Sequence, residues 1–323
     1  MLERSWVGQR VSIRRAVPRP DGRGGTDVAG TAQIAFADVV GDLLALDADH
    51  AVVESRTGLV EVPVAHVAIA KLVPASTRDE LELQAIIARG WVAAEQHTIG
   101  GWTLRANGGF TGRANSVLPQ APVGMPMDDA LAAVVEWYAA RDLPARFQVP
   151  VEGRRLLDAE LGERGWAPSE DVHVMTARLD AVADVDVSAG DVVLLDEPDD
   201  AWFEVYRGGA EDSPHSRALL TRHDHVTFAA VHDEGAVVAI GRATIDDAWL
   251  GVTAVDVVPA HRRSGRASAV MAALHEWGRA QGARRVHLEV TSGNAAALAL
   301  YSRLGFHVHH DYRYRSAPDG VTS

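Results

Sequence analysis

The segment from Val255 to Phe306 constrains the fold of this chain more than any other part of its sequence. It begins with an apolar stretch at 255–258 and a glycine-containing loop at 259–267. A helical pattern and a second apolar stretch at 285–290 follow. A strand that breaks into such a loop and restarts as a helix leaves unpaired backbone N–H groups, where the helix dipole favours negative charge. The segment therefore predicts an α/β unit that binds an anion on this loop.

The side chains of the loop suit a pyrophosphate. Gly265 and Ala267 carry little bulk, so an anion can approach the backbone closely. Arg262, Arg263 and Arg266 surround them with positive charge. Because arginines are also common before helices, the loop alone is equally consistent with a plain basic helix start.

The second half of the segment places a carboxylate and a phenol among apolar residues. Glu289 lies in the second apolar stretch, and Tyr301 lies in the helical pattern that follows Asn294. A carboxylate can take a proton from an ammonium, and a phenol can protonate a departing thiolate. Alternatively, Glu289 forms a buried ion pair with Arg284 or Arg285. In that case Tyr301 is a core aromatic residue and Asn294 is a helix N-cap.

Taken together, these residues resemble the coenzyme-A-binding core of the GNAT acetyltransferases. Arg262, Gly265 and Ala267 fill the family pattern Arg/Gln-x-x-Gly-x-Gly/Ala, and the second half is similar to acetyltransferases that modify ribosomal-protein N-termini. The resemblance implies acetyl-CoA as co-substrate, Glu289 as general base and Tyr301 as general acid. The cofactor contacts that it implies are Val255, Val257, Arg262, Arg263, Ser264, Gly265, Arg266, Ala267, Asn294 and Tyr301.

An internal repeat predicts a second copy of this fold. When the chain is laid on itself without gaps, Gly101 falls on Gly241, Pro119 on Pro259 and Gly165-Trp166 on Gly305-Phe306. We predict an α/β (α+β) protein with two tandem GNAT-like folds, each a mixed sheet flanked by helices. The alternative is convergent α/β patterning. The predicted boundaries are 75–185 for the first copy and 186–323 for the second, catalytic copy.

The first copy lacks the residues that the resemblance assigns to the chemistry. Met125 stands where the second copy has Gly265, Val149 where it has Glu289, and Leu161 where it has Tyr301. We therefore expect a degenerate first copy. Its segment 105–116 is unusually polar and glycine-rich, which predicts either the lining of a substrate cleft or a solvent-facing hairpin.

Residues 1–74 have the pattern of a small all-β domain. Short alternating or apolar stretches occur at 11–15, 38–43, 51–54 and 59–62. They predict an SH3-like β-barrel, similar to the leading domain of some actinobacterial GNAT proteins. Its role is either recognition of a partner or docking on the catalytic body.

The composition limits the kinds of partner. The chain carries 31 basic and 44 acidic residues, a net charge of −13, which argues against nucleic-acid or acidic-membrane binding. It has no cysteine, and His307, His309 and His310 lack a carboxylate at ligand spacing, so no metal site is predicted. Without an apolar signal or spanning segment, we expect a cytoplasmic protein.

The resemblance to the GNAT acetyltransferases therefore implies an acetyl-CoA-dependent N-acetyltransferase. The acceptor is a primary amine of a small molecule or a protein, which attacks the thioester directly. Two alternatives remain open: an acetyltransferase of basic proteins, histone-like or ribosomal, and a coenzyme-A-binding sensor with little catalysis. Monomer and homodimer are both consistent with the sequence.

Overall fold

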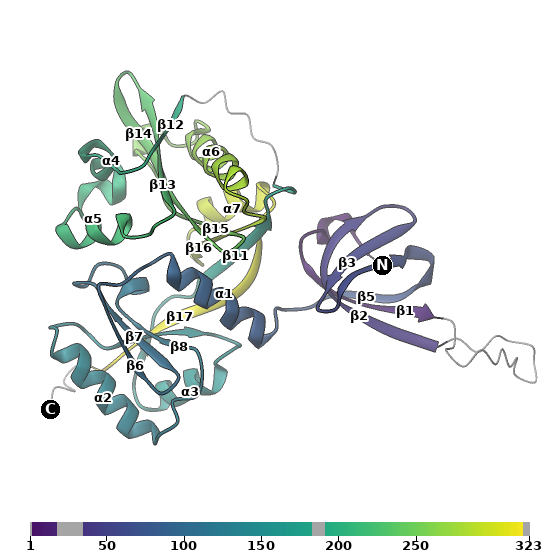
Figure 1. Ribbon diagram of the computed structural model, residues 1–323, viewed down its shortest axis with the longest axis horizontal. Coiled ribbons are helices and arrows are strands. Elements are labelled where there is room, and N and C mark those ends of the chain that lie inside the picture. Colours follow the sequence, from purple (N-terminus) through teal and green to yellow (C-terminus); the bar gives the residue numbers. More distant parts are fainter. Residues whose placement is uncertain (1, 18–34, 183–190, 319–323) are drawn as a thin grey trace, which may run out of the picture. The chain divides into compact units, whose positions relative to one another are not determined.

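The computed structural model describes residues 2–17, 35–182 and 191–318. The chain divides into two units, Met1–Ala75 and Ser76–Ser323 (Figure 1). The predicted boundary between two tandem folds, at residues 185 and 186, lies outside the described residues. All candidate site residues belong to the second unit.

The first unit is a five-stranded antiparallel sheet with the order β4-β3-β2-β1-β5. Short 3₁₀ turns, η1 (Arg4–Trp6) and η2 (Val64–His66), accompany the strands. The strands are β1 (Arg10–Val17), β2 (Ala35–Leu46), β3 (His50–Ser55), β4 (Gly58–Pro63) and β5 (Val67–Leu72). The four predicted strands are confirmed, and one face packs into a core that includes Val11, Ile13, Leu43 and Val53.

The predicted closed barrel is wrong, because this sheet is open. Strands β4 and β5 form its two edges and are joined through the turn η2. Pro63, the last residue of β4, has no N–H to donate to a further ladder. Barrel closure depends on strand tilt and stagger, which a pattern of short strands does not determine.

The second unit is a mixed α/β structure, as predicted. Its first part contains α1 (Thr77–Arg89), β6 (Glu95–Ile99), β7 (Trp102–Ala106), η3 (Gly112–Ala114), β8 (Val117–Pro119), α2 (Met127–Ala139), β9 (Arg146–Pro150), α3 (Arg155–Glu163), β10 (Ala167–Pro168) and β11 (Val172–Arg178). Its second part contains β12 (Val192–Leu195), α4 (Asp200–Val205), η4 (Tyr206–Gly209), α5 (Pro214–Thr221), β13 (Val226–Asp233), β14 (Ala236–Asp246), β15 (Trp249–Val257), η5 (Pro259–His261), α6 (Arg266–Ala280), β16 (Arg285–Thr291), α7 (Ala295–Arg303) and β17 (His307–Ser316).

One large sheet joins the two parts. Its order is β12-β13-β14-β15-β16-β11-β17-β9-β8-β7-β6, and β10 pairs with β17. Strand β11, from the first part, pairs with β16, whereas β17, from the second part, pairs with β9 (Figure 1). Each part thus lends its last strand to the sheet of the other. The two parallel pairs, β15 with β16 and β8 with β9, lie on opposite sides of this exchange.

The repeat agrees with the elements only in part. Helices α2 and α3 stand in the order of α6 and α7, with β9 and β16 between them. Gly101, however, lies in the turn between β6 and β7, whereas Gly241 lies within β14. The gapless alignment is therefore wrong at this point, because the β13–β14 hairpin is longer than the β6–β7 hairpin.

Three apolar clusters hold the second unit together. One lies beneath α6 and α7 and includes Met271 and Val286, and another lies beneath α2 and α3 and includes Tyr138 and Phe147. The third packs α1 and Trp91 against residues of α4, α5 and β13. This third cluster surrounds the polar groups described below.

Candidate active site

The strands β15 and β16 pair over only part of their length. The parallel pairing joins Trp249–Val252 to Arg285–Leu288, although β15 continues to Val257 and β16 to Thr291. At this point β15 contains a bulge: Ala254 has a φ of 55°, and the register with β14 shifts between Ile240 and Arg242. Beyond the bulge, the backbone of β15 on the β16 side is available to an extended ligand.

The loop after β15 ends at the N-terminus of α6. Gly265 is the N-cap of α6 with a φ of 82°, a left-handed conformation that glycine adopts without strain. No side chain caps this helix, and its first turn contains no acidic residue. Its first N–H groups therefore remain open to an anion.

The side chains around this loop hold its shape. Arg262 donates from Nε to the carbonyl of Val257 at 3.1 Å, and the Ser264 hydroxyl donates to the carbonyl of His261 at 2.5 Å. Arg266, in the first turn of α6, lies 2.8 Å from Asp233. Arg263 has a positive φ of 60°. The predicted loop residues are thus brought together at one helix end.

Asn294 lies at the start of the next helix. Its side-chain oxygen accepts a hydrogen bond from the backbone N–H of Ala297 at 3.2 Å, so Asn294 is the N-cap of α7. A capping amide retains its NH₂ group as a donor. The capping interpretation is confirmed, and it leaves a donor for a ligand.

Glu289 is a buried carboxylate with two partners. Its side chain is 1% exposed, and its Oε2 accepts a hydrogen bond from Arg113 Nε at 2.6 Å. Its Oε1 accepts one from the Tyr312 hydroxyl at 2.7 Å. The buried ion pair considered as the alternative role of Glu289 is present, but its partner is Arg113 and neither Arg284 nor Arg285. Arg285 is four positions before Glu289 in β16, which is about 13 Å along the strand. Its guanidinium instead lies over the ring of Trp249.

The polar segment 105–116 delivers Arg113 to this carboxylate. The predicted solvent-facing hairpin is wrong, because Asn107 and Asn115 are buried. The Asn115 side chain accepts from the N–H groups of Asn107 and Gly109 at 2.7 and 3.0 Å, and it donates to the carbonyls of Phe110 and Thr111 at 2.6 and 2.9 Å. A single amide side chain therefore organises the loop.

Glycine is required in this loop where it passes a tyrosine. A β-carbon at position 112 would lie 2.7 Å from the Tyr314 ring. The Ser116 hydroxyl also donates to the carbonyl of Gly112 at 2.7 Å. The glycine at position 112 is thus explained by close packing of the loop against β17.

Two arginines lie against the ring of Trp91. The guanidinium groups of Arg113 and Arg242 lie 5.1 and 5.3 Å from the ring centroid of Trp91. Burial opposes the charge of Arg113, but Glu289 acts together with the nearby tyrosines Tyr312, Tyr314 and Tyr206, and their combined effect raises the pKa of Arg113 above its ordinary value. Burial lowers the pKa of Arg242 to about 10. The acceptors of its hydrogen bonds are neutral groups, two backbone carbonyls and one hydroxyl, which do not offset the cost of burying the charge. Burial likewise raises the pKa of Tyr312, so Tyr312 is a neutral donor to Glu289.

Tyr301 lies on α7 and is 8% exposed. Its ring centroid is 5.9 Å from that of Phe306, and Val255 and Val257 pack against the same apolar cluster. Burial raises the pKa of Tyr301 to about 12, which keeps the phenol protonated at neutral pH. Tyr301 is thus a core aromatic residue in the apolar cluster that also contacts Val255 and Val257 of β15.

Sequence reasoning missed three contributors to this site, Arg113, Tyr312 and Trp91. Arg113 lay in the segment singled out for its polarity, which was the one available signal. Among the described residues, no group of histidine, aspartate and glutamate side chains could hold a metal ion. In the same part of the chain, no helix has the length and apolar character needed to span a membrane.

Comparisons with known proteins place this geometry in context. Residues 77–315 match the family model described as "Probable histone acetyltransferase Rv0428c C-terminal". The chain is 31% identical over 329 residues to the "Probable histone acetyltransferase Rv0428c" of Mycobacterium tuberculosis, covering 97% of each chain. It is 28% identical to the "Uncharacterized N-acetyltransferase YobR" of Bacillus subtilis over 247 residues, 73% of this chain and 98% of the relative.

A solved structure supports the fold. The chain is similar to a GCN5-related N-acetyltransferase from Kribbella flavida, with a TM-score of 0.59 and 19% identity. The similarity covers 75% of this chain and 96% of that structure. At this level of identity, the likeness concerns the fold alone.

Proposed function

This chain belongs to the family of the Rv0428c C-terminal domain and is a GNAT N-acetyltransferase, and from that premise we propose that it transfers the acetyl group of acetyl-CoA to a primary amine. The observation that carries the proposal is the opening between β15 and β16. An uncapped helix N-terminus follows β15, Glu289 follows the last residue of β16 that pairs with β15, and Tyr301 belongs to the apolar cluster against which Val255 and Val257 pack.

The second part of the unit fits acetyl-CoA. The backbone of Val255 and Val257 would pair with the extended pantetheine arm. The loop from Arg262 to Ala267 would hold the pyrophosphate on the N–H groups of α6, with Arg263 adding charge, and Asn294 would offer its amide NH₂. The absence of a capping side chain and of first-turn carboxylates on α6 supports this arrangement.

We propose that Glu289 accepts the proton of the attacking amine. Each carboxylate oxygen uses one lone pair for Arg113 or Tyr312 and retains another. Because the side chain is 1% exposed, the proton would reach it through a bridging water. As the amine adds to the thioester carbonyl and the carbon–sulfur bond breaks, Tyr301 would donate its phenol proton to the sulfur.

The first part of the unit does not suit acetyl-CoA. Asp128 and Asp129 occupy the first turn of α2, and Pro126 is its N-cap, so this helix end repels a diphosphate. Val149 and Leu161 are fully buried apolar residues at the positions of the base and the acid. We propose tandem GNAT-like folds that exchange β11 and β17, with a single coenzyme A site in the second.

The acceptor is proposed by chemical class. The net charge of −13 suits a basic protein tail, and the relative Rv0428c is named a probable histone acetyltransferase. Buried Arg105 and half-buried Arg113, which both interact with the charge of Glu289, instead favour a small amine that also carries an anionic group. We propose the small-molecule amine as the acceptor and the basic protein as the second candidate.

Thiol release from acetyl-CoA, measured with an amine panel and a histone-tail peptide, tests the proposal. Turnover should depend on the acceptor and should be greatest with amines that carry a carboxylate. Preference for the peptide would support the second candidate. Tight coenzyme A binding without turnover on any acceptor would contradict the enzyme and favour the sensor.

A further inference from the structure

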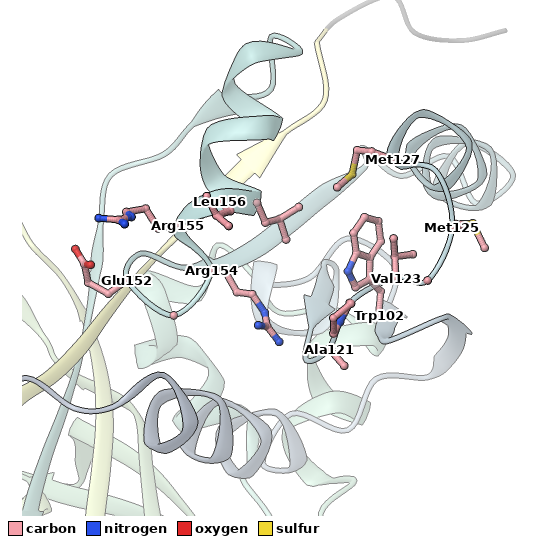
Figure 2. Close-up of a pocket in the computed structure, with 13 residues that line it drawn as sticks. Trp102, Ala121, Val123, Met125, Met127, Glu152, Arg154, Arg155 and Leu156 are labelled. Atoms are coloured by element: carbon pink, nitrogen blue, oxygen red, sulfur yellow. The ribbon is translucent and has the colours of Figure 1, made fainter.

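A cavity of about 710 Å³ lies in the first part of the second unit, away from Glu289 and the α6 loop. It is bordered by Trp102 and by two loops with the first residues of the helices that follow them: 121–127, between β8 and the start of α2, and 152–157, between β9 and the first turn of α3 (Figure 2). Since β8 and β9 are parallel neighbours, these loops occupy the place that the proposed acetyl-CoA loops occupy beside β15 and β16. No step of the proposed transfer uses this cavity.

The wall of the cavity is held by backbone contacts. The turn at Gly100 and Gly101 packs directly on the first loop: Gly101 donates to the carbonyl of Pro122 at 3.1 Å, and Ala121 donates to that of Gly101 at 3.0 Å. A β-carbon on Gly100 would lie 1.6 Å from the carbonyl oxygen of Val123. The hairpin therefore fixes the backbone of the wall at 121–123.

The lining is mainly apolar. Trp102 is 2% exposed and packs edge-to-face on Phe147, with ring centroids 4.9 Å apart. Val123, Met125 and Met127 line the same space (Figure 2). Methionine adapts its shape to an apolar ligand. A cavity of this size with an apolar lining and few polar groups is typical of a small-molecule site.

Arg154 supplies the charge of this cavity. Its Nε donates to the carbonyl of Pro119 at 2.8 Å, and its Nη2 donates to the carbonyl of Gln120. The guanidinium is thereby fixed in place with donors to spare, and in the described part of the chain no carboxylate pairs with it. Burial lowers the pKa of Arg154, as expected of a cation without a negative partner. Figure 2 shows Arg154 reaching toward Ala121, while Arg155 and Glu152 point away.

The charges at the rim select the type of anion. Asp128 and Asp129 lie in the first turn of α2 next to the first loop; Arg164 pairs with Asp128 at 2.8 Å, and the charge of Asp129 disfavours a ligand with several negative charges. A single carboxylate can pair with the fixed guanidinium, and a hydrocarbon body can fill the apolar remainder. We propose that this cavity binds a small amphipathic carboxylate, an aliphatic or aryl acid, with its carboxylate on Arg154 and its apolar part against Trp102, Val123 and Met127.

Calorimetry on the full chain with octanoate and 3-phenylpropanoate tests this proposal. Arg154→Met should weaken octanoate binding by about 10- to 100-fold, because a charge-assisted hydrogen bond is lost. The neighbouring Arg155→Met is the matched control and should leave binding unchanged. Octanol, which lacks the carboxylate, should bind the unaltered chain more weakly than octanoate does. Its affinity for the Arg154→Met variant should equal its affinity for the Arg155→Met variant.

A second variant keeps the test independent of folding. Met125 is exposed, so Met125→Asp should fold normally, and it should weaken octanoate by placing a carboxylate in the cavity. Saturating coenzyme A should not displace octanoate. The proposal would be overturned by failure of both acids to bind at millimolar concentration, by equal loss in the Arg154 and Arg155 variants, or by displacement by coenzyme A. None of these results would affect the proposed transferase function.

Discussion

The ion pair between Arg113 and Glu289 joins the two parts of the second unit, and its removal should be costly. Arg113→Met leaves Glu289, with its side chain 1% exposed, without its cationic partner. Breaking one side of a buried pair costs about 3–5 kcal/mol, since an uncompensated charge stays buried. For a unit of this size, that corresponds to a fall of roughly 6–20 °C in Tm.

The assay is thermal and urea unfolding of four chains. The double variant Arg113→Met with Glu289→Gln should recover about half of the loss or more, because no buried charge is left unpaired. Arg78→Met, which breaks an exposed helix pair with Glu82, is the control and should change stability by less than about 0.5 kcal/mol. A loss below about 1 kcal/mol for Arg113→Met, or no recovery in the double variant, would refute this reasoning.

Two further predictions concern the cofactor and pH. Gly265→Asp should abolish coenzyme A binding in calorimetry while Met125→Asp leaves it intact at one site per chain; two equivalent sites would contradict the degenerate first copy. Burial, aided by the charge of Arg279, lowers the pKa of His275 to about 4, against about 6.5 when unfolded. The unfolded chain then binds the extra proton, so stability falls as pH drops from 6.5 toward 4, by about 2 kcal/mol at pH 5 from this residue. His275→Phe should flatten the pH dependence of the free energy of unfolding, and an unchanged slope would count against it.

The local parts of the site could be predicted from the sequence, and the long-range parts could not. The loop at Gly265 follows from a strand, a glycine and a helix that are neighbours in the chain. The partner of Glu289 lies 176 residues away in the other part of the unit, and no local pattern connects them. Tyr312 reaches the same carboxylate because β17 crosses into the sheet between β11 and β9, which the repeat did not indicate.

The open sheet of the first unit illustrates the same limit. The alternation around Val11 and Val53 predicts strands and a buried face, and both are observed. Whether β4 meets β5 depends on the accumulated twist and stagger of five strands. The residues of the individual strands do not determine that sum.

The pH dependence of acetyl transfer by Glu289→Gln tests the central claim most directly. Glutamine keeps the shape of the side chain and its hydrogen-bond reach but cannot take a proton. With one amine acceptor, kcat/KM at neutral pH should fall by roughly 10²–10⁴-fold. Part of this loss should be recovered at higher pH, where more of the amine is already neutral. Tyr301→Phe should lose less and show no such recovery, and Glu276→Gln, an exposed change on α6, should behave as the unaltered chain. Near-full activity of Glu289→Gln at neutral pH would contradict the account.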